Sequence, residues 1–216
     1  MYSDLLSLSQ SLSNFVVGME GNVSKKENNI ITIKASGTSL KTLSQTDLVS
    51  FDSKGKQISN FNKRGSMELS FHMYLYKNFD IKYIAHTHPT NLLKILVSDE
   101  IYKFAHERMF PDQVIFNGKK SCVVPYAKPG EPLMKMIEKH LEKFIKEEKF
   151  FPSIILLKNH GLIACGKTVS ECLYATEICE KSAEIFMSNL KPIFLTEDDI
   201  IELIEDDKEK YRKEQL

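Results

Sequence analysis

The sequence predicts a single α/β domain over residues 1–216, in which a mainly antiparallel sheet is covered by helices in a layered arrangement. With 42% hydrophobic and 27% charged residues, the chain has the composition of a globular protein, and its length suits one sizeable core. Short β-branched runs and longer runs with helical periodicity are interspersed along it. Since these runs do not follow the strict strand–helix–strand alternation of a parallel sheet, we expect mostly antiparallel pairing.

The N-terminal part predicts one helix followed by two strands. Apolar residues between Ser3 and Phe15 recur at helical spacing, and the pattern stops at Gly18. Residues 30–35 and 46–51 are rich in β-branched side chains and are separated by polar turns, which is typical of strands.

The middle of the chain alternates helical and extended patterns. Residues 66–76 predict a helix with Glu68 in its first turn, where a carboxylate interacts favourably with the helix dipole. A short strand is expected over residues 81–86, a helical stretch over 90–107 and another strand over 121–125.

The C-terminal third predicts an amphipathic helix from Glu131, strands over residues 153–157 and 161–165, and a long helix over 168–190. The charged segment from about residue 196 has three interpretations: a solvated helix, a helix that rests on a neighbouring subunit, or a fraying tail.

The charge and cysteine content limit the class of protein. Twenty-nine basic residues balance twenty-nine acidic ones, so the net charge does not indicate a nucleic-acid or membrane partner. No apolar run approaches the length of a transmembrane helix, and the first residues lack the pattern of a secretory signal, so we expect a cytoplasmic protein. Four cysteines without close paired spacing fit reduced thiols.

The run His86-Thr87-His88-Pro89 is the most informative feature of the sequence. Side chains alternate along a strand, so the two imidazoles point the same way at the end of an apolar strand. His160 follows another strand-like run directly. If the three converge, they form a zinc site with an open coordination position, which is typical of catalytic zinc. An all-imidazole site suits zinc, although Co²⁺, Ni²⁺ or Mn²⁺ can also occupy it.

The remaining histidines, His72, His106 and His140, are interpreted as ordinary surface or core residues because no ligand-like spacing accompanies them. A lone histidine is more often structural than functional.

Three turns of small polar residues precede the histidines. They are residues 21–24 with Asn22, residues 35–38 with Ser36 and Gly37, and residues 65–66 with Ser66. Each offers backbone amides and short polar side chains suited to a phosphate group, but each is also an ordinary turn composition.

Glu68 lies two residues after Ser66 and has two interpretations. It is either a residue that stabilises the helix start or, if it faces the metal, a general acid/base. In the second case a metal polarises a carbonyl and the carboxylate moves a proton at the adjacent carbon.

These motifs, in this order, closely resemble the class II aldolase/adducin family, which includes the fuculose-phosphate and rhamnulose-phosphate aldolases. The resemblance covers roughly residues 5–190. Its elements are Gly21-Asn22-Val23-Ser24, Ser36-Gly37-Thr38, Ser66-Met67-Glu68, His86-Thr87-His88-Pro89, Pro125-Tyr126-Ala127 and Asn159-His160-Gly161.

The resemblance implies an α/β/α domain with a central, mainly antiparallel sheet flanked by helices, assembled as a homotetramer with active sites at subunit interfaces. It implies three zinc ligands, an acid/base and a site for the phosphate of a small phosphorylated sugar. The implied zinc ligands are His86, His88 and His160, the implied acid/base is Glu68, and the implied phosphate-binding residues are Asn22, Ser36, Gly37 and Ser66.

Two positions depart from the fuculose-type pattern. Met67 stands where those enzymes have a second serine, which removes one hydroxyl from the phosphate site. Those enzymes also use a tyrosine as a proton donor, and residues 110–116 contain none; Asp112 and Tyr211 are speculative replacements.

The resemblance therefore implies a zinc-dependent aldolase of carbohydrate metabolism. Such a carbon–carbon lyase reversibly cleaves a phosphorylated ketose to dihydroxyacetone phosphate and an aldehyde through a metal-bound enediolate. Three alternatives stay open: dehydration as in methylthioribulose-phosphate dehydratases, epimerisation by retro-aldol chemistry, and a non-catalytic adducin-like interaction domain. Adducin heads lack the zinc histidines that this chain has, so we favour catalysis.

Overall fold

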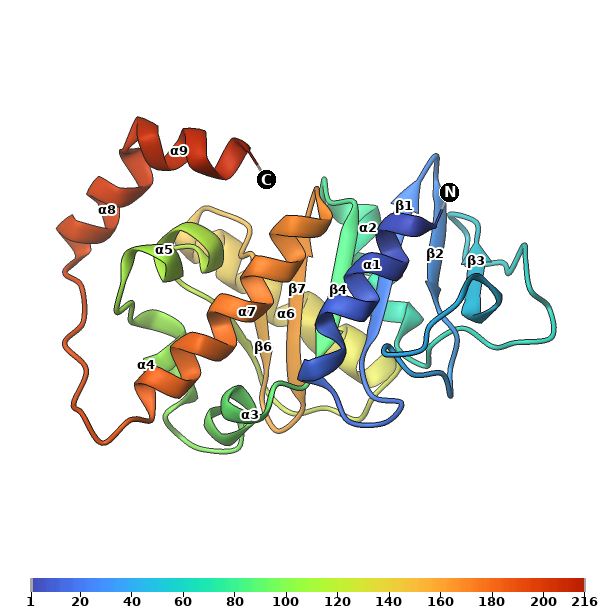
Figure 1. The fold of residues 1–216 in the computed structure, drawn as a ribbon, viewed down its shortest axis with the longest axis horizontal. Coiled ribbons are helices and arrows are strands. Elements are labelled where there is room, and N and C mark those ends of the chain that lie inside the picture. The colour runs from blue at the N-terminus through green and yellow to red at the C-terminus, as the bar shows by residue number, and fades with distance from the viewer. Residues whose placement is uncertain (1, 216) are drawn as a thin grey trace.

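The computed structural model describes residues 2–215 and has a seven-stranded sheet at its centre (Figure 1). The strand order is β3-β2-β1-β4-β7-β6-β5, and every neighbouring pair is antiparallel except β5 with β6. The strands are β1 (Asn22–Glu27), β2 (Ile30–Lys34), β3 (Leu48–Phe51), β4 (Tyr83–Thr87), β5 (Cys122–Val124), β6 (Ile154–Leu157) and β7 (Gly161–Gly166). The predicted mainly antiparallel sheet is confirmed.

Helices cover both faces of this sheet. On the near face in Figure 1 lie α1 (Ser3–Leu12) and α7 (Val169–Phe186), with α3 (Thr90–Leu96) below them. On the far face lie α2 (Leu69–Asn78) and α6 (Glu131–Glu148). The layered α/β/α arrangement is therefore as predicted.

The alternation of strand side chains explains why both faces need a cover. In β6, Ile154 and Leu156 belong to the core under α1 and α7, whereas Ile155 and Leu157 belong to the core under α2 and α6. All four side chains are buried, and burying one such side chain stabilises the fold by roughly 1.5–3 kcal/mol. A continuous apolar run is what a strand buried on both faces requires.

Several elements differ from their predicted bounds. The helical stretch expected over residues 90–107 is two helices, α3 and α4 (Ile101–His106), because the Ser98 hydroxyl bonds to the Ile95 carbonyl and accepts from the Glu100 amide between them. Helix α5 (Pro111–Asn117) was not predicted; it opens with proline at its first position, where no amide hydrogen is needed.

Strand β1 is the other element that the sequence analysis did not predict. Residues 21–24 were interpreted as a turn, but only Gly21 lies outside the strand, with φ 67°. β1 is a central strand, paired with β2 on one side and β4 on the other. Its polar residues hide the strand pattern: Ser24 and Lys25 are buried, Ser24 through a hydrogen bond with His72 and Lys25 through an ion pair with Asp4.

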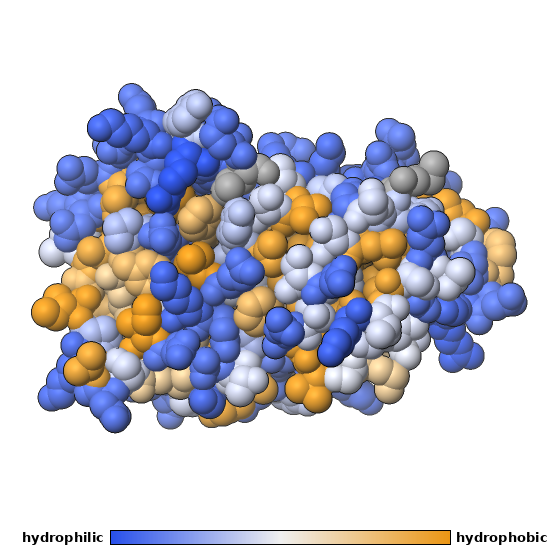
Figure 2. Space-filling model, viewed as in Figure 1, coloured by the Kyte–Doolittle hydropathy of each residue, from blue (hydrophilic) through white to orange (hydrophobic). Residues whose placement is uncertain are grey.

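The C-terminal segment forms α8 (Glu197–Glu205) and α9 (Asp207–Glu214), which pack over α5 at the upper left of Figure 1. Thr196 and Asp199 form a capping box at the start of α8. Figure 2 shows a predominantly hydrophilic surface over this part of the molecule. Among the helices within residues 2–215, none combines the length and apolar character needed to cross a lipid bilayer.

Candidate metal centre

Three histidines converge at one end of the sheet. His86 lies in β4, His88 follows it directly, and His160 lies in the turn between β6 and β7. Because β4 pairs with β7 with Thr87 opposite Leu162, this turn lies beside the end of β4. One ring nitrogen from each histidine lies within 4.8 Å of the others, so the three could hold a metal ion.

The backbone at these positions suits the cluster. Asn159 has φ 58°, a left-handed conformation that asparagine tolerates better than most residues. A Cβ at position 161 would collide with the His88 ring and the Thr87 carbonyl, so only glycine lets the β6–β7 turn approach the end of β4. This explains the run Asn159-His160-Gly161.

The His86 ring is oriented by the backbone. Its Nδ1 lies 2.8 Å from the Leu162 carbonyl oxygen, which only accepts, so Nδ1 carries the hydrogen and Nε2 presents a lone pair. That Nε2 lies 3.1 Å from Nε2 of His88. A metal-ligating histidine is commonly held in this way by a carbonyl on its other nitrogen.

Burial keeps all three rings neutral. The pKa of each ring is lowered from 6.5 to about 4, mainly by burial and, for His88 and His160, also by the neighbouring imidazoles. Neutral imidazole is the form that binds a metal, so the rings need not lose a proton at neutral pH.

Glu68 lies against the cluster from the start of α2. Its Oε2 lies 3.2 Å from Nε2 of His86, and its Oε1 lies 3.3 Å from Nε2 of His160. Within residues 2–215, Oε1 has no hydrogen-bond partner, although the side chain is buried. Burial raises the pKa of Glu68, while His160 and a hydrogen bond from Asn22 lower it. Three neutral nitrogens and a partly unsatisfied carboxylate around one small volume fit a divalent cation.

The predicted phosphate-binding residues lie in neighbouring segments. The Asn22 side-chain amide lies 2.9 Å from Oε2 of Glu68 and 3.3 Å from the Ser66 hydroxyl, so these three residues are brought together directly. The turn with Ser36 and Gly37 joins them through the backbone, since the Ser36 amide donates to the Arg64 carbonyl and Ala35 pairs with Gly65. Gly37 has φ 76° and no atom near its missing Cβ, so its side faces open space.

Lys34 is a residue beside this site that the sequence analysis did not identify. Its ammonium donates to the carbonyls of Met19, at 3.2 Å, and Thr38, at 2.5 Å, and so ties the loop before β1 to the turn after β2. Burial lowers its pKa to about 8, against the charge of Glu68, which raises it. A lysine in a strand directly before a small-residue turn was the available signal.

His72 is the second such residue. It was interpreted as an ordinary histidine, but it is fully buried and its Nε2 lies 2.5 Å from the Asn22 side-chain oxygen. Its position four residues after Glu68 on a helix was the available signal.

The positions that depart from the fuculose-type pattern are also defined. Met67 is 75% exposed beside Glu68. Asp112 forms an ion pair of 2.7 Å with Arg212 of α9, so it belongs to the α5–α9 contact of this chain, whereas the neighbouring Tyr211 is exposed.

Comparison with known proteins agrees with the fold and with the motifs. The family model for the class II aldolase and adducin N-terminal domain matches residues 6–187. An L-fuculose phosphate aldolase of Methanococcus maripaludis is 31% identical over 180 residues, which cover 82% of this chain and 91% of that protein. A 3-oxo-tetronate 4-phosphate decarboxylase of Haemophilus influenzae is 28% identical over 193 residues, 88% of each chain.

The solved structure of an L-fuculose 1-phosphate aldolase superimposes with a TM-score of 0.75 at 20% sequence identity, covering 96% of this chain and 94% of that one. This likeness shows a common fold. Together with the match of the family model over most of the sequence, it establishes that the chain belongs to the class II aldolase and adducin family.

Proposed function

We propose that this protein is a zinc-dependent aldolase that reversibly cleaves a small phosphorylated ketose to dihydroxyacetone phosphate and an aldehyde. The observation that carries the proposal is the position of Glu68, whose two carboxylate oxygens lie 3.2 and 3.3 Å from ring nitrogens of His86 and His160. An acid/base group beside a three-histidine site is the arrangement that proton transfer next to a polarised carbonyl requires.

In this proposal His86, His88 and His160 hold the zinc ion. When bound, the ion supplies Lewis acidity toward the carbonyl and hydroxyl oxygens of the substrate. The imidazoles are neutral ligands and leave the double positive charge of the ion uncompensated.

Glu68 moves the proton. In the cleavage direction the hydroxyl that becomes the aldehyde oxygen gives its proton to water, the carbon–carbon bond breaks, and the carboxylic acid of Glu68 gives a proton to the carbon that loses the aldehyde fragment. In the condensation direction the carboxylate removes a proton from that carbon, and the new hydroxyl takes one from water. Burial raises the pKa of Glu68, which makes its carboxylate a better base.

Asn22, Ser36, Gly37 and Ser66 bind the phosphate group. Gly37 offers its backbone amide and Ser36 its hydroxyl, while the Ser66 hydroxyl, which accepts from Asn22, keeps its own hydrogen for the phosphate. With Met67 exposed and apolar, the phosphate receives one hydroxyl fewer than in the fuculose-type enzymes.

Decarboxylation of a phosphorylated 3-oxo acid is a second candidate. It is favoured by the match to the Haemophilus influenzae decarboxylase, which spans 88% of both chains. Loss of carbon dioxide next to a carbonyl also produces an enolised fragment, so the same ligands and the same carboxylate would serve it.

One experiment separates these reactions. The zinc-loaded protein is incubated with dihydroxyacetone phosphate and a panel of small aldehydes, and in parallel with a phosphorylated 3-oxo acid. New carbon–carbon bonds support the aldolase, whereas release of carbon dioxide without condensation supports the decarboxylase. If neither occurs, and water loss from a phosphopentulose and epimerisation are also absent, the non-catalytic interaction domain is favoured.

The homotetramer, the single domain over residues 1–216 and the cytoplasmic location stay predictions. The exposed apolar side chains of Val17, Met19 and Met67 lie in segments next to Asn22 and Glu68 and suit a subunit contact at the site. Mass measurement in solution tests the tetramer.

A further inference from the structure

A continuous chain of buried hydrogen bonds leads away from Glu68 into the protein interior. The Asn22 amide nitrogen lies 2.9 Å from Oε2 of Glu68, and the Asn22 oxygen lies 2.5 Å from Nε2 of His72. Nδ1 of His72 lies 2.7 Å from the Ser24 hydroxyl, which lies 2.8 Å from the Tyr76 hydroxyl. None of these five residues is more than 8% exposed.

The periodicities of one strand and one helix assemble this chain. Glu68, His72 and Tyr76 are spaced by four residues at the start of and along α2, so they share one helix face. Asn22 and Ser24 are spaced by two residues along β1, so they share one sheet face. The strand residues fill the gaps between the helix residues, and the polar groups alternate between the two elements.

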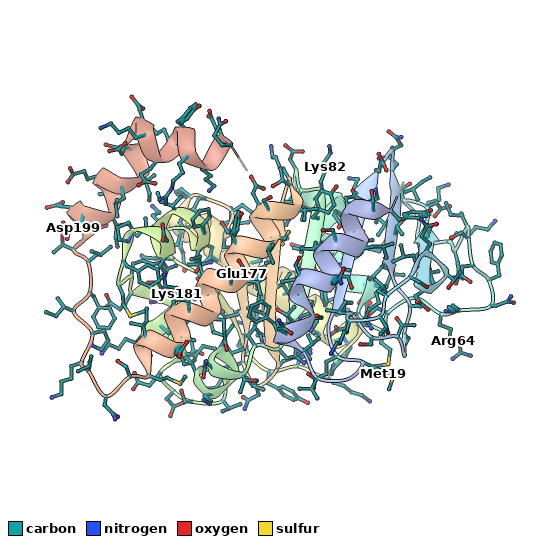
Figure 3. All side chains as sticks on the ribbon, in the orientation of Figure 1. Met19, Arg64, Lys82, Glu177, Lys181 and Asp199 are labelled. Atoms are coloured by element: carbon teal, nitrogen blue, oxygen red, sulfur yellow. The ribbon has the colours of Figure 1, made fainter. Side chains whose placement is uncertain are left out.

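This series of hydrogen bonds runs parallel to the strands. Asn22 pairs with His86 at the end that carries the metal centre, near Met19, whereas Tyr76 lies near the opposite end, 3.3 Å from the Lys82 carbonyl. Figure 3 labels Met19 and Lys82 at the lower and upper ends of the sheet.

The donors and acceptors fix a single direction for this chain. The Glu68 carboxylate only accepts, so the Asn22 amide nitrogen must face it, and the Asn22 oxygen then faces His72. His72 must therefore carry its hydrogen on Nε2. Burial lowers the pKa of His72 well below 6.5, so the ring is neutral and its Nδ1 accepts from Ser24.

The direction continues to Tyr76. Since the Ser24 hydrogen points to His72, the Ser24 oxygen accepts from the phenol of Tyr76 at 2.8 Å, in competition with the longer contact of 3.3 Å to the Lys82 carbonyl. Burial raises the pKa of this phenol well above 10, so it keeps its proton. Every hydrogen in the chain then points toward Glu68.

We propose that His72 is a positioning residue, which holds the Asn22 side chain in the one orientation that donates to Glu68 and to the Ser66 hydroxyl of the proposed phosphate site. This inference rests on the proposed function of Glu68 as the proton-transfer group. A reversed Asn22 side chain would direct its oxygen at the Glu68 carboxylate, which only accepts, and would lose the hydrogen bond that Nε2 of His72 donates, so the two contacts together exclude it. The fixed donor occupies Oε2 of Glu68 and leaves Oε1 free for the proton of the substrate.

Two substitutions of similar size separate positioning from mere packing. In His72→Gln the side-chain amide reaches about the place of Nε2 and can still donate to Asn22. In His72→Asn the shorter amide reaches about the place of Nδ1 and can serve only Ser24. Both variants lose the ring, so they share this packing defect and differ in volume by one methylene group.

The readout is solvent proton exchange into dihydroxyacetone phosphate by the zinc-loaded protein, which reports the Glu68 step without an aldehyde. We expect kcat for exchange to fall about 10-fold or more in His72→Asn and about 3-fold or less in His72→Gln, at equal zinc content, because a hydrogen bond to a charged group is lost only in the first. Equal losses in the two variants, or a larger loss in His72→Gln, would overturn the proposal.

The tautomer of His72 in the unaltered protein tests the same inference without any assay of activity. Ring nitrogen chemical shifts measured by NMR should show a neutral imidazole with hydrogen on Nε2. Hydrogen on Nδ1, or a protonated ring at neutral pH, would overturn the proposal even if the enzyme is active. Absence of proton exchange in the wild-type protein, with the Nε2–H tautomer present, would instead contradict the proposed function and leave the orientation of Asn22 standing.

Discussion

Oε2 of Glu68 lies 3.2 Å from Nε2 of His86, so the candidate acid/base and a candidate metal ligand meet in one small buried volume. A carboxylate this close to the lone pair of a neutral imidazole is unfavourable unless a cation lies between or beside them. The same contact puts the carboxylate within reach of any substrate oxygen that joins the metal.

Replacement of Glu68 by glutamine keeps the shape and the contact with Asn22 but removes the base. We expect zinc binding to be retained and kcat for proton exchange to fall by about 10²–10⁴-fold. Glu20→Gln is the matched control, since Oε2 of Glu20 also faces the cluster, 3.5 Å from Nδ1 of His88, but its side chain is 45% exposed. Equal effects of the two substitutions would show that only the local charge matters.

Gly161→Ala should disrupt the metal centre without touching a ligand. The added Cβ would collide with the His88 ring and the Thr87 carbonyl, so the turn that carries His160 must move. We expect a clear loss of zinc affinity in a titration of the metal-free protein. Gly18→Ala, whose Cβ meets no atom within 4 Å although its φ is 63°, should cost about 1 kcal/mol of stability and leave zinc affinity unchanged.

Metal retention should resist acid. Burial lowers the pKa of His86, His88 and His160 to about 4. Protons should therefore displace zinc only as the pH falls toward 4, and not near 6.5. Dialysis against buffers of decreasing pH, followed by metal analysis, checks this. Loss of most of the zinc at about pH 6 would contradict the lowered values.

Stability of the metal-free protein should change in the same window. Between the ordinary pKa of 6.5 and the lowered value of about 4, the unfolded chain binds more protons at these rings than the folded protein does. The free energy of unfolding contributed by these groups is therefore present above pH 6.5 and is lost as the pH falls through this range. Urea unfolding at several pH values measures it.

The free energy of unfolding should also depend on Lys34, at alkaline pH. Burial lowers its pKa from 10.5 to about 8, so the folded protein releases this proton before the unfolded chain does. The stability difference between the wild type and Lys34→Met should shift in favour of the wild type as the pH rises from 8 to 10.5. A flat difference for Lys34→Met would sink the prediction.

Those parts of the fold that depend on apolar periodicity could be predicted from the sequence. In the helices α1, α6 and α7 the spacing of the apolar side chains indicates which face is buried. In the strand of residues 154–157 the continuous apolar run indicates burial on both faces. The convergence of the three histidines could be predicted because His86 and His88 lie two residues apart at the end of one strand, and because Gly161 allows the turn with His160 to approach them.

The rest depends on contacts between distant segments. Strand β1 was not predicted because the buried environment of Asn22, Ser24 and Lys25 is polar, and the partners that make it tolerable come from α1 and α2. For the same reason His72 was interpreted as an ordinary residue. Its partner Asn22 lies fifty positions away in the sequence, and only the packing of α2 on β1 brings the two together.

The central claim is that His86, His88 and His160 hold a catalytic divalent metal ion, and metal content tests it most directly. Purified protein and the variants His88→Ala and His140→Ala are loaded with zinc, dialysed and analysed for bound metal, with the half-buried His140 as the control outside the cluster. The account predicts about one zinc ion per chain in the wild type and in His140→Ala, and almost none in His88→Ala. A wild-type protein that cannot acquire zinc, or a His88→Ala variant that retains it fully, would contradict the account.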